Sequence, residues 1–160
     1  MNTKAQIKEL AMLVGDGLSV YIAVHDAIFR DAASLTSLFK NLLGRGVPMG
    51  ELLERAESLV PMWDRIGAKV ETFRIDYGSY LSDEEEAYFD ILARYVNALR
   101  KTVAALVARQ ELAFEGSNGG PKNPMTWAAY KNLDADYETA VEAYSAIGRE
   151  LSASAPTIFS

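Results

Sequence analysis

The only histidine of the chain, His25, lies in the apolar run 18–29. An imidazole in such a run can bind a haem or metal, line a ligand pocket, or stay neutral in a buried hydrogen bond. Zinc sites in enzymes use two or three histidines, or one with cysteines, and the chain contains no cysteine. Ile22 stands where a di-iron Glu-x-x-His motif needs glutamate, and only haem ligation with a methionine stays open. We therefore expect His25 to be a buried structural residue, with no metal and no cofactor.

A ligand pocket is the alternative interpretation of the same histidine. His25 follows Tyr21 by one helical turn on an otherwise apolar face, and Trp63 on the next helix is a large aromatic neighbour. Ligand sites in helical bundles lie between helices, so a pocket formed by His25, Tyr21 and Trp63 would bind a small molecule or cofactor.

Carboxylates at three-residue spacing suggest a second type of chemistry. Glu51, Glu54 and Glu57 could present oxygens to Mg²⁺ if Glu71 or Asp90 faced them, as a metal-dependent nucleotide phosphohydrolase would require. The segment 86-EAYFD-90 has one residue too many for the usual Glu-x-x-Asp partner motif. No serine-hydrolase elbow and no phosphate-binding glycine loop occurs in the sequence, so we assign no catalytic residue.

A row of tyrosines recurs at seven-residue intervals near the C-terminus. Tyr130, Tyr137 and Tyr144, preceded by Trp127, lie nearly on one line of a helix. Rings with a polar tip suit either the edge of a core or a protein interface. Packing at the edge of the bundle core is the interpretation that we favour, and contact of these four residues with a partner or a second copy of the chain is the alternative.

Four helices are needed to position these residues. Apolar residues at steps of three and four predict helices at about 3–43, 48–77, 83–115 and 124–151. Ser82 with Glu85 forms a capping box before the third helix, Pro61 should kink the second, and the tail 152–160 should be irregular. Similar lengths and short connections favour a single domain, 1–160, folded as an antiparallel, up-down-up-down four-helix bundle.

The triplet 15-GDG-17 interrupts the first predicted helix. Two interior glycines cost about 2 kcal/mol relative to alanine, so we expect a bend or break that leaves a short helical segment before Gly15. A hairpin turn between 10-LAMLV-14 and 18-LSVYIAV-24 is the alternative, although no other segment offers these strands a partner.

The charge and hydropathy of the chain exclude several classes of protein. Its formal net charge is −6, and no segment is basic, which argues against nucleic-acid binding and against attachment to anionic lipid. The longest apolar run is too short for a membrane span of about 20 residues. We expect a cytoplasmic, non-enzymatic interaction module, an adaptor or regulator that binds a protein partner or itself. A cofactor-binding bundle and a Mg²⁺-dependent phosphohydrolase are the alternatives.

Overall fold

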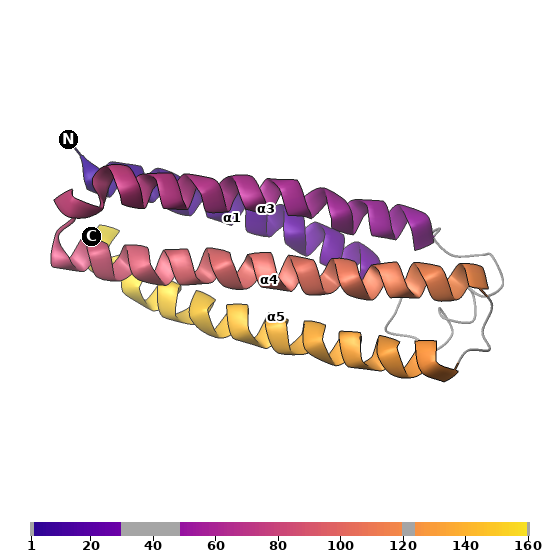
Figure 1. Ribbon diagram of the computed structural model, residues 1–160. Helices are drawn as coiled ribbons and strands as arrows, with labels where there is room; N and C mark the ends of the chain where they lie inside the picture. The colour runs from indigo at the N-terminus through magenta and orange to yellow at the C-terminus, as the bar shows by residue number, and fades with distance from the viewer. Residues whose placement is uncertain (1, 30–48, 120–123, 160) are drawn as a thin grey trace.

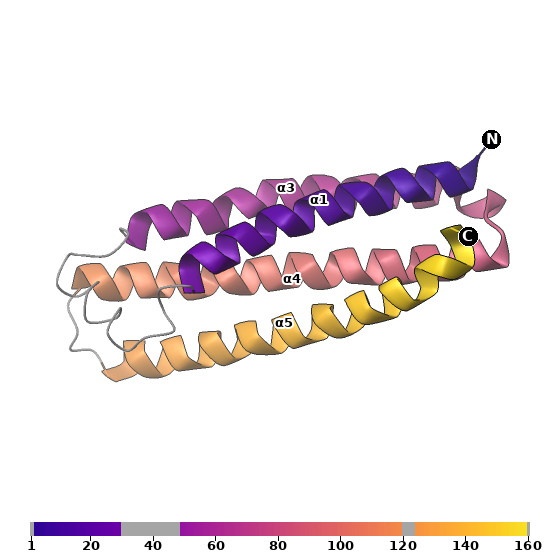
Figure 2. The same ribbon diagram turned by 180° about the vertical axis from the view of Figure 1, so that it is seen from behind.

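Four long helices make up the part of the chain that the structure describes. The computed structural model describes residues 2–29, 49–119 and 124–159 (Figure 1). They form the helices α1 (Thr3–Phe29), α3 (Met49–Tyr77), α4 (Asp83–Gly119) and α5 (Pro124–Phe159), with a short 3₁₀ turn η1 (Gly78–Tyr80). Neighbouring helices along the chain run in opposite directions, and both termini lie at one end (Figures 1 and 2). The predicted all-α, antiparallel four-helix bundle is confirmed, and none of the described residues forms a strand.

The helices do not contact one another equally. α4 packs along both α3 and α5, whereas α1 packs mainly on α3 and less on α4. Figure 2 shows α1 starting beside α3 and crossing obliquely, so that its last turns approach the level of α4. The two halves of α1 therefore meet different neighbours. No helix in the described ranges is long and apolar enough to cross a membrane.

A single apolar core runs along the bundle. Ile7, Val14, Tyr21 and Ile28 recur at seven-residue intervals and are all buried, as the periodicity of the sequence predicts. Among the residues whose side chains the structure describes, the largest fully buried one is Trp63 of α3, which is 1% exposed. The predicted continuation of the first helix to residue 43 lies outside the described residues.

Helix α1 passes through 15-GDG-17 without a break, so the segment before Gly15 belongs to α1 itself and no hairpin forms. The structure gives Gly17 a packing role that the sequence does not reveal. A Cβ atom at Gly17 would lie 2.6 Å from Ile66 Cδ1 and 3.4 Å from Trp63, whereas one at Gly15 would meet nothing within 4 Å. Gly17 lets α1 approach α3 closely, and Gly15 has no comparable contact.

The ends of the helices include one confirmed prediction and two corrections. The capping box is present, since the Ser82 N–H donates to Glu85 Oε2 at 2.9 Å and the Glu85 N–H donates to Ser82 Oγ. The expected irregular tail is wrong, because α5 continues through Pro156 to Phe159. Burial explains this extension: Ile158 is 4% exposed, and the Phe159 ring packs edge-on against Tyr88. α4 likewise runs four residues beyond the predicted end at 115, to Gly119.

Pro61, where the sequence predicts a kink, does not interrupt α3. α3 is one continuous helix from Met49 to Tyr77, although Pro61 lies inside it. Pro61 is exposed, so the carbonyl group that it leaves without a helical partner faces the solvent side of the bundle.

Candidate functional site

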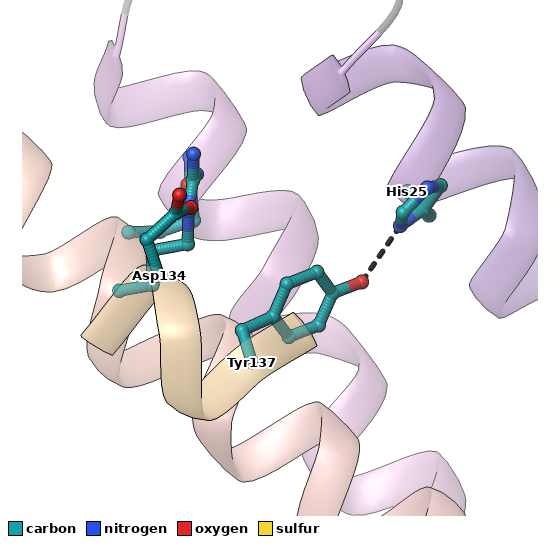
Figure 3. Close-up of polar contacts among 5 residues, drawn as sticks. His25, Asp134 and Tyr137 are labelled. Carbon is teal, nitrogen blue, oxygen red and sulfur yellow. Dashed lines mark hydrogen bonds and ion pairs between the residues drawn. The ribbon is translucent and has the colours of Figure 1, made fainter. Parts of the chain in front are cut away.

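Tyr21 and His25 of α1 meet Tyr137 of α5 in a continuous chain of hydrogen bonds. The Tyr137 hydroxyl lies 2.7 Å from His25 Nδ1 and 2.5 Å from the Tyr21 hydroxyl. Figure 3 shows Tyr137 reaching from its helix toward the imidazole. We call these three residues the Tyr–Tyr–His chain. It joins α1 to α5 through His25 and Tyr137, which are 112 residues apart in the sequence.

The protonation states of the Tyr–Tyr–His chain follow from its surroundings. Burial lowers the pKa of His25, the Arg109 guanidinium lowers it further, and Asp26 opposes both. Burial also raises the pKa of Tyr137 to about 12 and raises the pKa of Tyr21. At neutral pH the two phenols are therefore protonated and the imidazole is neutral. In the Nε2–H tautomer of the imidazole, the Tyr21 O–H donates to the Tyr137 oxygen and the Tyr137 O–H donates to His25 Nδ1.

A shell of aromatic and charged side chains surrounds these hydrogen bonds. Phe29 stacks on the Tyr137 ring with centroids 5.5 Å apart, and it also packs against His25. The Arg109 guanidinium of α4 lies 4.5 Å from the Phe29 centroid and 5.0 Å from that of Tyr130. Arg109 is 7% exposed, so its charge is removed from bulk water and requires partners.

Polar groups of the same chain neutralise Arg109. Arg109 Nε donates to the Asp134 carboxylate, and its Nη1 donates to Gln110 Oε1 at 2.6 Å. Two buried polar residues, Arg109 and Gln110, are thereby satisfied next to the Tyr–Tyr–His chain. Through these contacts Arg109 of α4 links Asp134 of α5 with Phe29 of α1.

Trp63, the third residue of the predicted pocket, lies beside Gly17 of α1. Trp63 packs beneath Gly17, one helical turn of α1 before Tyr21, and makes no ring contact with His25 or Tyr21. Its indole Nε1 is buried and donates no hydrogen bond within the described part of the chain. His25 and Tyr21 therefore share the hydrogen-bonded cluster with Tyr137, and Trp63 lies with Tyr21 in the apolar core.

The predicted tyrosine row faces the inside of the bundle. Tyr130 packs against Arg109, and Tyr137 is only 2% exposed. The half-buried Tyr144 makes edge-to-face contacts with Tyr21 and with Tyr95 of α4. The heptad spacing thus places three rings on one face, as predicted, and this face packs against α1 and α4. The side chain of Trp127 lies outside the described residues.

The acidic residues proposed as a magnesium site stay apart. Glu51, Glu54 and Glu57 are exposed on α3, and Glu51 accepts a hydrogen bond from Arg55 at 2.6 Å. Asp90 pairs with Arg74 instead of facing them. Among the residues that the structure describes, no group of three or more His, Asp or Glu could hold a metal ion.

An open groove between α1 and α3 is the feature that the sequence interpretation missed. It has a volume of about 640 Å³ and lies toward the N-terminus of α1, beyond the close contact at Gly17. We call it the α1–α3 groove. It is lined by Gln6, Glu9, Leu10, Met12, Leu13, Asp16, Ala68, Lys69, Thr72, Phe73, Asp76 and Tyr77.

The α1–α3 groove has an apolar floor and a charged rim. Leu10, Leu13 and Tyr77 are half-buried, and Phe73 is buried and packs against the Tyr77 ring. Met12 stands at the edge with 56% of its surface exposed. The one signal in the sequence is that Met12 is an apolar residue off the buried stripe of α1.

No protein-family model, curated protein or solved structure matches the chain. The geometry of the two regions is therefore the basis for an assignment of function.

Proposed function

We propose that the protein is a non-enzymatic interaction module that binds another polypeptide in the α1–α3 groove. The observation that supports this proposal is the groove itself, with its apolar floor and the exposed Met12 at its edge. Exposed apolar surface bordered by polar residues is typical of sites that bind proteins. A groove between two helices is also the surface on which amphipathic helices dock.

The Tyr–Tyr–His chain supports this function by positioning α1. Its hydrogen bonds fix the second half of α1 on α5. At the other end, the Thr3 hydroxyl donates to Glu85 Oε1 at 2.9 Å and ties the first turn of α1 to α4. A helix anchored at both ends presents a preformed groove, which lowers the entropy cost of binding.

The two alternative functions have less support from the described residues. A small-molecule site at His25 would need unpaired polar groups, whereas the Nδ1 atom and both phenols are already paired within the chain. A magnesium-dependent hydrolase would need converging carboxylates, and Glu51 and Asp90 instead pair with separate arginines.

A photo-crosslinking amino acid tests whether the groove binds a polypeptide. p-Benzoylphenylalanine would replace Met12 in the groove and, as the matched control, Ile75, which is 81% exposed on α3 outside the groove lining. We expect discrete adducts in cells from position 12 and none of the same mass from position 75. An adduct of twice the chain mass would identify self-association. Absence of discrete adducts at position 12, or the same adducts at both positions, would contradict the proposal.

A further inference from the structure

We infer, building on the proposed function, that the α1–α3 groove binds a basic amphipathic helix of a partner protein. The inference names the conformation and the charge of the occupant. Both follow from the shape of the groove and from the groups at its rim.

The dimensions of the groove suit a short stretch of helix. Its lining extends from Gln6 to Asp16 on α1 and from Ala68 to Tyr77 on α3, which corresponds to a length of roughly 15 Å at 1.5 Å per residue. The two helices are antiparallel neighbours, and they close the groove at the contact of Gly17 with Ile66. An occupant of about three turns fits between this contact and the N-terminal end of α1.

The backbone of the lining favours a helical occupant over an extended one. Both walls are α-helices whose backbone groups are bonded internally, so they offer no edge to which a strand could add. A helix satisfies its own backbone and needs only apolar side chains at i, i+3 or i+4, and i+7 to cover the floor. Met12 has a flexible, polarizable side chain that adapts to such a partner.

The charges at the rim determine the sign of the partner. Glu9, Asp16 and Asp76 line the groove against a single cation, Lys69, which leaves a formal charge of −2. None of these four forms an ion pair within the described residues. Other surface carboxylates are neutralised by arginine, as in the pairs Asp64–Arg100, Asp90–Arg74 and Glu150–Arg94. The rim of the groove thus keeps uncompensated negative charge that a basic partner would complement.

Gln6 adds a hydrogen-bond acceptor to the acidic rim. Its Oε1 atom is buried and accepts no hydrogen bond within the described residues. Gln6 lines the groove on α1, in the same region as Asp76 and Tyr77 of α3. The N–H group of a lysine or arginine side chain at the edge of a docked helix would satisfy this atom.

Peptide titration with NMR detection tests the inference on the full-length protein. The probe is a synthetic leucine–lysine peptide of about 14 residues whose leucines fall on one helical face. The two comparison peptides are a shuffled one of the same composition without that face and an amphipathic leucine–glutamate one. At about 0.15 M salt, where surface charges are screened beyond about 8 Å, we expect saturable binding of the first peptide only. Its backbone shifts should map to 6–16 and 68–77.

Two groove variants and a charge-matched control define the site. Met12→Ser should weaken binding about tenfold because it removes the apolar contact without adding charge, and the pair Asp16→Lys with Asp76→Lys should do so because it reverses the charge complementarity. Glu138→Lys with Glu142→Lys makes the same change in net charge on the exposed face of α5 and should change the affinity less than about twofold. Equal weakening by the α5 variant would reduce the binding to general attraction between opposite charges and overturn the inference.

The remaining outcomes separate this inference from the proposed function. Tight binding of the leucine–glutamate peptide in the groove would contradict a basic partner. It would still be consistent with the proposed function as an interaction module. A crosslinked dimer from position 12 would identify a second copy of the chain as the occupant and contradict a separate basic partner. If no peptide binds and position 12 gives no adduct, both proposals fail.

Discussion

The two halves of α1 use the same helix in opposite ways. From Gly17 onward the helix faces α5 with polar groups that are paired inside the protein, through the Tyr–Tyr–His chain. Before Gly17 it faces α3 with apolar and acidic groups that stay open to solvent in the α1–α3 groove. The oblique path of α1 brings its last turns toward α4 (Figure 2), and Tyr21 and His25 of this second half contact Tyr137 of α5.

This comparison assigns separate roles to two kinds of polar group. Tyr137 is buried and His25 is half-buried, and their hydrogen bond fixes the position of the helix because breaking it would leave a partly desolvated partner. Asp16 and Glu9 are exposed, contribute little to stability and are free to determine specificity. Substitutions in the second half of α1 should therefore change the free energy of unfolding, and those at the rim of the α1–α3 groove should change the affinity for a partner.

The largest effect should come from removing the Tyr137 side chain. Tyr137→Ala deletes a ring that is 2% exposed and stacked on Phe29, and we expect a loss of about 3–5 kcal/mol in the free energy of unfolding. Urea denaturation followed by circular dichroism measures it. Tyr80→Ala, at a tyrosine that is 66% exposed, is the matched control and should stay within about 0.5 kcal/mol. Similar losses for the two variants would show that the α1–α5 contact does not anchor α1.

A smaller substitution isolates the hydrogen bonds from the ring. Tyr137→Phe keeps the stacking but leaves the Tyr21 hydroxyl and His25 Nδ1 without their shared partner, so we expect a loss of about 1–3 kcal/mol. Adding Tyr21→Phe to this variant should cost less than Tyr21→Phe costs alone, because the second hydroxyl has already lost its partner. Strictly additive losses in this double-mutant cycle would mean that the two phenols are not coupled.

The two glycines of α1 mark the transition between its halves. Gly15→Ala should raise the free energy of unfolding by up to about 1 kcal/mol, since alanine favours the helix and nothing obstructs its Cβ. Gly17→Ala gains the same propensity but forces its Cβ against Ile66, at an overpacking cost of about 1–3 kcal/mol. The two urea midpoints should move in opposite directions relative to the parent chain. A gain of equal size at both positions would show that α1 does not approach α3 closely at Gly17.

The glycines illustrate which parts of this structure the sequence could predict. Periodicity alone predicted the buried face Ile7, Val14, Tyr21 and Ile28, because helix geometry is local. It could not distinguish Gly15 from Gly17, since the difference depends on where α3 crosses. The tail was predicted incorrectly for a similar reason: Pro156 is a local helix breaker, and the burial of Ile158 that outweighs it depends on tertiary packing.

The candidate sites depended even more on tertiary structure. A polar His25 on an apolar stripe predicted a buried hydrogen bond, and in the structure the half-buried imidazole forms a partly buried one with Tyr137. Its partner, Tyr137, could not be identified from the sequence, because helix order and register are set by long-range packing. The α1–α3 groove depends on the angle of α1 and could not be predicted from either helix alone.

The pH dependence of stability should be the smallest and most specific test of the Tyr–Tyr–His chain. The groups that face His25 are Asp26 on its own helix, Arg109 of α4 and Tyr137 of α5, and burial with Arg109 lowers the histidine pKa in the folded protein. The unfolded chain, with a histidine pKa of about 6.5, therefore binds a proton at a higher pH than the folded chain. The contribution of His25 is fully present above this value and is lost as the pH falls from about 6.5 toward the lower pKa of the folded state.

The His25→Gln variant isolates this contribution, because glutamine keeps a polar side chain and does not titrate. Between about pH 7.5 and pH 5.5, across the unfolded histidine pKa, the urea midpoint of the parent should fall more than that of His25→Gln. Parallel slopes would mean that burial of a neutral imidazole adds nothing to the pH dependence. If the parent protein instead became more stable than His25→Gln at lower pH, the pKa of His25 would be raised in the folded state. A charged imidazole would then face Tyr137. The α1–α5 contact would then depend on a cation, and its contrast with the charged, open half of α1 would no longer hold.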